Sequence, residues 1–130
     1  MPRKVKSAKP LIYVFCEGES EQAYTDYLKK TFSDVAVLKR PPDTGLFEEA
    51  EAKFSKSPKY KNSIDVTDEI WFFYDVEEKD IPKWNDRFTI IKKLRKLRKK
   101  QGIRVRLLMT SGVLVYVALQ ILYSETHYRS

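Results

Sequence analysis

The sequence predicts an α/β protein with a mainly parallel sheet of about four strands and flanking helices. Two continuous apolar runs, LIYVFC over Leu11–Cys16 and EIWFFY over Glu69–Tyr74, are typical of strands buried on both faces of a parallel sheet. Between the predicted strands lie stretches whose apolar residues have helical spacing. Strands that alternate with helices imply right-handed crossovers, and such crossovers connect parallel strands.

After the first strand, the chain alternates between helix and strand. Helical spacing over Glu21–Phe32 predicts the first helix, and Val35–Leu38 predicts a short second strand. The spacing of Leu46, Phe47, Ala50 and Phe54 predicts a second amphipathic helix. The range 55–68 is polar and predicts a surface connection to the strand at Glu69–Tyr74.

The second half of the chain predicts one long helix and one further strand. The helix spans Trp84–Gln101, and Gly102 takes the place of a C-terminal glycine. Its predicted apolar stripe consists of Trp84, Phe88, Ile90, Ile91, Leu94 and Leu97. Ile103–Met109 predicts the last strand, and Val113–Tyr123 predicts an apolar closing segment.

Length and composition predict a single cytoplasmic domain. We expect a basic, flexible leader over residues 1–9 and one α/β domain over residues 10–130. The single cysteine, Cys16, excludes an internal disulfide and a zinc site made of several thiolates. No apolar run is long enough to span a bilayer and the N-terminus lacks the apolar part of a signal peptide, so we expect no membrane partner.

The charge of the chain favours an anionic partner, of which nucleic acid is the usual one. The net charge is +7, and the range 89–101 carries seven basic residues and no acidic one. Lys92, Lys93 and Lys96 line one side of the predicted helix, so they are the candidate nucleic-acid-binding residues. The alternative is a solvated helix face with no ligand.

Carboxylates follow the two most apolar strands directly. Glu17 follows the first of them, and Asp75 and Glu77 follow the strand at 69–74. Ligands bind beyond the carboxyl ends of strands in open parallel sheets, and hard cations prefer carboxylate oxygens. The pattern therefore predicts a site for Mg²⁺ or Mn²⁺ at Glu17, Asp75 and Glu77. The alternative is that Glu17 only decorates a helix start and that Asp75 only caps a helix or turn.

The predicted roles of these residues differ. Asp75 and Glu77 would hold a metal that orients and polarises a phosphate. Glu17 either shares that metal or acts as the general base toward an attacking water, and the sequence leaves both open. Gly18 permits a tight turn beside Glu17, and Glu21 lies one helical turn later in a supporting position.

Two motifs in these segments resemble a known family. LIYVFCEGESEQAYTDYL, followed about fifty residues later by EIWFFYDVEE, resembles the RloB family of Toprim-type proteins. In that family one apolar strand ends in Glu-Gly-x-Ser/Thr-Glu and a second ends in Asp-x-Asp/Glu. The residues that match the first motif are Glu17, Gly18, Ser20 and Glu21, and those that match the second are Asp75 and Glu77. The resemblance covers roughly residues 11–112 and implies a Toprim-like fold.

The resemblance also implies a function. Toprim domains occur in topoisomerases, primases and overcoming-lysogenization-defect nucleases, where these carboxylates hold magnesium for phosphodiester chemistry. RloB-like proteins are associated with phage defence, so a metal-dependent nuclease of abortive infection or restriction is the expected activity. Self-association or a companion defence protein is then expected as well. The alternatives are a catalytically inactive nucleic-acid-binding or regulatory protein and a nucleotide-binding signalling domain. An ordinary P-loop NTPase is excluded, because the sequence contains no Walker phosphate loop.

The resemblance weakens toward the C-terminus. Gly112 and Tyr116 match the family's next segment, but Val115 stands in place of its acidic residue and Val117 in place of its tryptophan. The only histidine, His127, comes later than the family's His-Tyr or His-Phe pair. We therefore expect the Toprim-like domain to be truncated or diverged at this end.

Overall fold

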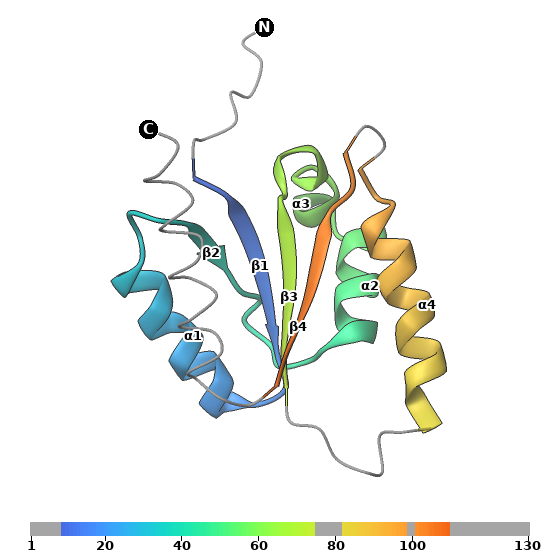
Figure 1. Ribbon diagram of the computed structural model, residues 1–130, viewed down its shortest axis with the longest axis horizontal. Helices are drawn as coiled ribbons and strands as arrows, with labels where there is room; N and C mark the ends of the chain where they lie inside the picture. Colours follow the sequence, from blue (N-terminus) through green and yellow to red (C-terminus); the bar gives the residue numbers. More distant parts are fainter. Residues whose placement is uncertain (1–8, 75–81, 99–100, 110–130) are drawn as a thin grey trace, which may run out of the picture.

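The computed structural model describes residues 9–74, 82–98 and 101–109. It forms one parallel sheet with helices on both faces (Figure 1). Among the described residues, every helix is too short or too polar to cross a membrane. The elements in chain order are β1 (Leu11–Cys16), α1 (Glu19–Thr31), β2 (Val37–Lys39), α2 (Phe47–Lys56), α3 (Pro58–Lys61), the 3-10 turn η1 (Ile64–Val66), β3 (Glu69–Tyr74), α4 (Trp84–Arg95) and β4 (Arg104–Met109).

The four described strands are all parallel and lie in the order β2-β1-β3-β4. The chain moves outward from β1 to β2, and then crosses to the other side of β1 to form β3. The strand order therefore reverses between β1 and β3, which are direct neighbours. The predicted α/β class and the parallel sheet are confirmed.

Each face of the sheet has its own hydrophobic core, because side chains alternate along a strand. Ile12, Val14 and Cys16 of β1 point into the core beneath α1, together with Leu28 of that helix. Trp71 and Phe73 of β3 point into this same core, whereas the alternate side chains of β1 and β3 point into a larger core beneath α2 and α4. That second core contains Tyr13, Phe15, Phe47, Ala50, Phe54, Tyr60, Ile70, Phe72, Tyr74, Ile90, Ile91, Leu94, Ile103 and Val105. Burial on both faces explains why β1 and β3 read as continuous apolar runs.

The described structure differs from the sequence predictions in the helices. The helix predicted over Trp84–Gln101 ends at Arg95, and Gly102 does not cap it. Phe88, assigned to the buried stripe of that helix, is 51% exposed. The range 55–68 is more than a surface connection, because it forms α3 and η1 and buries Tyr60. The predictions for residues 1–8, for residues 75–81 and for residues 110–130 lie outside the described part of the chain.

Candidate functional site

Glu17 lies at the carboxyl end of the sheet, meaning the end at which the parallel strands finish. It directly follows β1, and its backbone N–H donates a hydrogen bond to the carbonyl of Phe73 in β3 (3.1 Å). The register that pairs Cys16 with Phe73 therefore brings the ends of β1 and β3 together. Glu17 is exposed there. Ligands of open α/β sheets bind beside the point where the strand order reverses, and Glu17 occupies that point.

The first turn of α1 adds a second carboxylate to this end of the sheet. Gly18 is the N-cap residue, and its carbonyl accepts a hydrogen bond from the backbone N–H of Gln22 (3.1 Å). A Cβ atom built at Gly18 would lie 3.6 Å from a carboxylate oxygen of Glu21, so this carboxylate reaches back to the helix start. Glu19 and Ser20 are exposed beside it. Negative charge is favourable at this position, because the N-terminus of a helix carries a partial positive charge.

Gly18, expected to permit a tight turn beside Glu17, does not use the conformational freedom of glycine. Gly18 has φ −145° and ψ 180°, an extended conformation that any residue adopts. The nearest atoms to an added Cβ are at ordinary van der Waals distance. The backbone itself therefore does not require a glycine beside Glu17.

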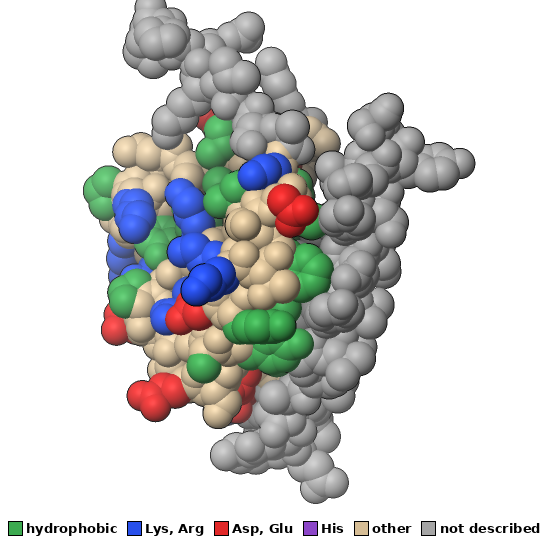
Figure 2. Space-filling model, turned by 90° about the vertical axis from the view of Figure 1, so that its left-hand side faces the viewer, with side chains coloured by type: hydrophobic (Ala, Val, Ile, Leu, Met, Phe, Trp, Pro, Cys, Tyr) green, Lys and Arg blue, Asp and Glu red, His purple; other side chains and the backbone are tan. Residues whose placement is uncertain are grey.

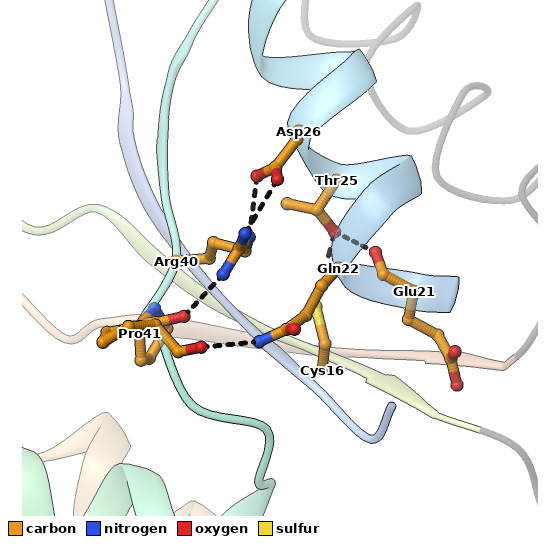
Figure 3. Close-up of polar contacts among 8 residues, drawn as sticks. Cys16, Glu21, Gln22, Thr25, Asp26, Arg40 and Pro41 are labelled. Atoms are coloured by element: carbon orange, nitrogen blue, oxygen red, sulfur yellow. Dashed lines mark hydrogen bonds and ion pairs between the residues drawn. The ribbon is translucent and has the colours of Figure 1, made fainter. Parts of the chain in front are cut away.

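The loop between β2 and α2 is fixed against the same end of the sheet. The backbone N–H of Gly45 donates to the carbonyl of Cys16 (2.8 Å). Arg40 donates two hydrogen bonds to the carboxylate of Asp26 in α1 (2.7 and 2.8 Å), and Gln22 donates to the carbonyl of Pro42 (3.3 Å) (Figure 3). The side chain of Glu21 points away from the Asp26–Arg40 pair in this view. These contacts hold the loop, and they leave the Glu21 carboxylate outside the network.

Cys16, the last residue of β1, is a core residue and is not arranged as a nucleophile. Its side chain is buried, and its Sγ lies 3.4 Å from the hydroxyl of Thr25. The Thr25 hydroxyl in turn donates to the carbonyl of Glu21 (2.8 Å). Burial raises the pKa of the Cys16 thiol, which disfavours the reactive thiolate. Cys16 is therefore a buried thiol of the core.

A buried arginine, which the sequence reading did not select, lies near this end of the sheet. Arg87, in the first turns of α4, is 7% exposed. Its guanidinium carbon lies 5.0 Å from the ring centre of Phe47 and 5.2 Å from that of Trp84. Burial raises the pKa of nearby Tyr74, and the positive charge of Arg87 acts in the opposite direction. Buried arginines are rare, so the burial of Arg87 makes it a candidate functional residue. In the sequence, nothing distinguishes Arg87 from the many other basic residues.

The described residues include two carboxylates of the kind that hard cations prefer. Glu17 and Glu21 both lie at the carboxyl end of the sheet, while Asp75 and Glu77 lie outside the described residues. Within residues 9–74, 82–98 and 101–109 there is no group of three or more acidic, histidine or cysteine side chains that could hold a metal ion. Mg²⁺ usually binds one or two carboxylates and completes its shell with water and phosphate oxygens, so this donor set is of the right kind for it.

The three predicted nucleic-acid-binding lysines differ in their described contacts. All three are exposed, but Lys93 forms an ion pair with Glu51 of α2 (3.3 Å). Lys96 follows the last turn of α4 as its C-cap residue. Lys92 lines a groove together with Arg95, which the sequence reading did not select.

Comparisons with known proteins gave no match: no protein-family model fits the chain, and no curated protein or solved structure is similar to it. The resemblance to RloB-like proteins therefore stays a prediction from the two sequence motifs. The structure shows a parallel α/β sheet with acidic residues at the point where its strand order reverses.

Proposed function

We propose that this protein binds a divalent cation, Mg²⁺ or Mn²⁺, at the carboxyl end of β1 and β3 and uses it to act on phosphodiester bonds. The observation that carries the proposal is the position of Glu17, exposed and hydrogen-bonded through its backbone to β3 where the strand order reverses. In the sequence, Asp75 and Glu77 follow the last residue of β3 and supply further carboxylates.

The chemistry of this end of the sheet supports the proposal in two ways. The carboxylate of Glu17 is a hard oxygen donor of the kind that such cations prefer, and the carboxylate of Glu21 at the start of α1 adds negative charge in a supporting position. The bound cation would polarise a phosphate oxygen and stabilise the negative charge that develops during hydrolysis. Arg87 is a buried positive charge near the same end of the sheet, and its charge would favour an anionic substrate there.

Two roles for Glu17 are compatible with this placement, and they predict different results for one variant. If Glu17 is a ligand, Glu17→Gln should weaken binding of the cation. If Glu17 is the general base, the same variant should bind the cation normally and lose hydrolysis by about 10²–10⁴-fold. The two measurements therefore have to be made on the same preparation.

Calorimetric titration with Mg²⁺ and Mn²⁺ tests the proposal. Asp75→Asn and Glu77→Gln should each weaken cation binding relative to the unchanged protein. Asp65→Asn is the matched control, because Asp65 is an exposed carboxylate in η1, at the opposite end of the sheet. A protein that binds neither cation, or that binds them equally well in all variants, would remove the metal site from the proposal.

Hydrolysis is then measured with labelled single-stranded and double-stranded DNA and RNA, with and without added cation. Cation-dependent cleavage that Asp75→Asn abolishes and Asp65→Asn preserves is the expected result. Cation binding without any cleavage would instead favour a regulatory protein that keeps the site but lacks catalysis.

A further inference from the structure

A groove runs between α4 and the strand β4, away from the carboxylates. Its volume is about 400 Å³, within the range of about 300–1,000 Å³ that is common for ligand sites. The helix side of the groove follows a regular spacing of three and four residues, which places its members on one face. The residues that line the two sides are Asn85, Phe88, Thr89, Ile91, Lys92 and Arg95 from α4 and Leu107 from β4.

The groove is basic, and its two cations are not used elsewhere in the described structure. Neither Lys92 nor Arg95 forms an ion pair or side-chain hydrogen bond with any described residue, and no acidic side chain lines the groove. Other basic residues are committed to the fold. Arg98 donates to the carbonyl of Thr67 (2.8 Å), and Arg106 pairs with Glu69 (2.6 Å).

The face that carries α1 has a different distribution of charge. Figure 2 looks at that side of the molecule and shows lysine and arginine side chains interspersed with acidic ones. The bidentate pair of Arg40 with Asp26 joins α1 to the loop after β2. The α4–β4 groove thus holds two positive charges for which the described residues supply no neutralising partner, and this suits an anionic ligand.

The groove also exposes apolar surface that charge alone does not explain. Phe88 is 51% exposed and Leu107 is 37% exposed. Phe88 contacts the ring of Trp84 on one side (5.4 Å between ring centres), which supports the exposed ring. An exposed aromatic ring beside unpaired cations is the combination that binds single-stranded nucleic acid, where bases stack and phosphates are neutralised.

We propose that the α4–β4 groove binds a single-stranded segment of nucleic acid, with one base stacked on Phe88 and the adjacent phosphates beside Lys92 and Arg95. The choice of nucleic acid as the anionic polymer rests on the proposed function. From Asn85 to Arg95 the helix rises about 15 Å, which matches about four stacked nucleotides at about 3.4 Å each. Because α4 begins near the carboxyl end of the sheet, a nucleic-acid strand bound in the groove would run toward the end of the sheet at which Glu17 lies.

Binding of two labelled probes in the presence of EDTA, which removes divalent metal ions, tests this groove separately from the proposed metal site. The probes are a short oligothymidine and an abasic oligomer of the same length, each followed by fluorescence anisotropy over a range of salt concentrations. Phe88→Ala should weaken oligothymidine binding about fivefold or more and leave binding of the abasic oligomer unchanged. Phe88→Trp should preserve binding, because it keeps an aromatic ring at this position.

The cations are tested with a paired variant. Lys92→Ala combined with Arg95→Ala should weaken binding of both probes. It should also reduce the slope of log affinity against log salt by about 1.4, since each single-strand phosphate contact contributes about 0.7. Lys30→Ala combined with Lys59→Ala removes the same charge from exposed positions on other helices and is the matched control. Tyr27→Ala is the control for Phe88, because Tyr27 is an aromatic residue of α1 that is 60% exposed.

Three outcomes would overturn the proposal. The first is equal binding of oligothymidine and the abasic oligomer by the unchanged protein. The second is that Phe88→Ala behaves like Tyr27→Ala in a sample whose circular dichroism shows it to be folded. The third is that Phe88→Ala abolishes self-association but not oligothymidine binding, in which case the groove seats a second copy of the chain. Loss of Mg²⁺ or Mn²⁺ binding in Glu17→Gln bears on the proposed function alone, because binding of the probes to the groove is measured in EDTA.

Discussion

Two polar side chains at the amino end of the sheet, Asp68 and Tyr13, hydrogen-bond to other parts of the protein, whereas Glu17 and Ser20 at the carboxyl end are exposed. At the amino end, a carboxylate oxygen of Asp68 accepts a hydrogen bond from the backbone N–H of Leu11 (2.9 Å). The hydroxyl of Tyr13 lies 2.9 Å from that of Ser63. At the carboxyl end, Glu17 and Ser20 are exposed. The polar contacts at the amino end therefore close the fold, while the carboxyl end has exposed polar groups, as the proposed cation site requires.

The largest effect on stability is expected where the amino end is broken. Asp68→Ala removes the acceptor for Leu11 and the carboxylate that faces Arg98 (4.0 Å), whose side chain is only 10% exposed. Leaving the Leu11 N–H without an acceptor and the partly buried charge of Arg98 without its carboxylate should lower the free energy of unfolding by about 2–4 kcal/mol. Urea unfolding followed by circular dichroism measures the change.

Asp65→Ala is the control for this experiment, because Asp65 is exposed and lies three residues away. It should change the free energy of unfolding by less than about 0.5 kcal/mol. Equal unfolding curves for the Asp68 and Asp65 variants would mean that the amino end is not held together by its polar contacts.

A smaller loss of stability is expected at the carboxyl end, from the backbone of one glycine. Gly45 has φ +150°, a conformation that residues with a side chain rarely adopt, and an added Cβ would lie 2.7 Å from the Cβ of Glu49. Gly45→Ala should therefore lower the free energy of unfolding by about 1–3 kcal/mol. Thermal and urea unfolding of the variant check this value.

The other glycine at this end of the sheet provides the comparison. Gly18 is extended and has room for a methyl group, so Gly18→Ala should leave the stability within about 0.5 kcal/mol of the unchanged protein. A destabilisation by Gly18→Ala as large as that by Gly45→Ala would show that the loop geometry is not the reason for the difference.

The strands were predictable from sequence because both of their faces are buried. The bounds of β1 and β3 agree with the two apolar runs, and such runs leave little freedom in where a strand begins and ends. The position of Glu17 followed from the same runs, since a residue after a buried strand must lie at the end of the sheet. No local pattern announces the positive φ of Gly45, because it is imposed by the hydrogen bond between the loop and β1.

The helix α4 was less predictable, because tertiary contacts override its periodicity. Its sequence remains helical in character to residue 101, yet the carbonyl of Arg95 accepts a hydrogen bond from Ile103 as the chain turns into β4. A prediction from residue polarity also assigns Phe88 to the buried face of the helix and Arg87 to the exposed face. The structure reverses this, since the rings of Phe47 and Trp84 stabilise a buried guanidinium.

The smallest effect is expected from the ion pair that joins α1 to the loop after β2. Two hydrogen bonds from Arg40 lower the pKa of the Asp26 carboxyl below its usual value of 3.8. Because the pKa is lower in the folded state, the pair stabilises the protein above the pKa of the unfolded chain. That stabilisation is lost as the pH falls through the pKa of the folded state. The Asp26 side chain is 50% exposed, so solvent screening limits the contribution to less than about 1 kcal/mol.

Asp26→Asn should therefore destabilise the protein slightly at neutral pH and not at all once the carboxyl of the unchanged protein is protonated. Urea unfolding across a pH series measures the difference, and added salt should shrink it at neutral pH. Asp34→Asn is the control, since Asp34 is an exposed carboxylate just beyond the end of α1. A difference that persists at low pH would assign the effect to packing of the side chain and not to charge. A difference of several kcal/mol at neutral pH would mean that this exposed pair holds the carboxyl end as firmly as Asp68 holds the amino end.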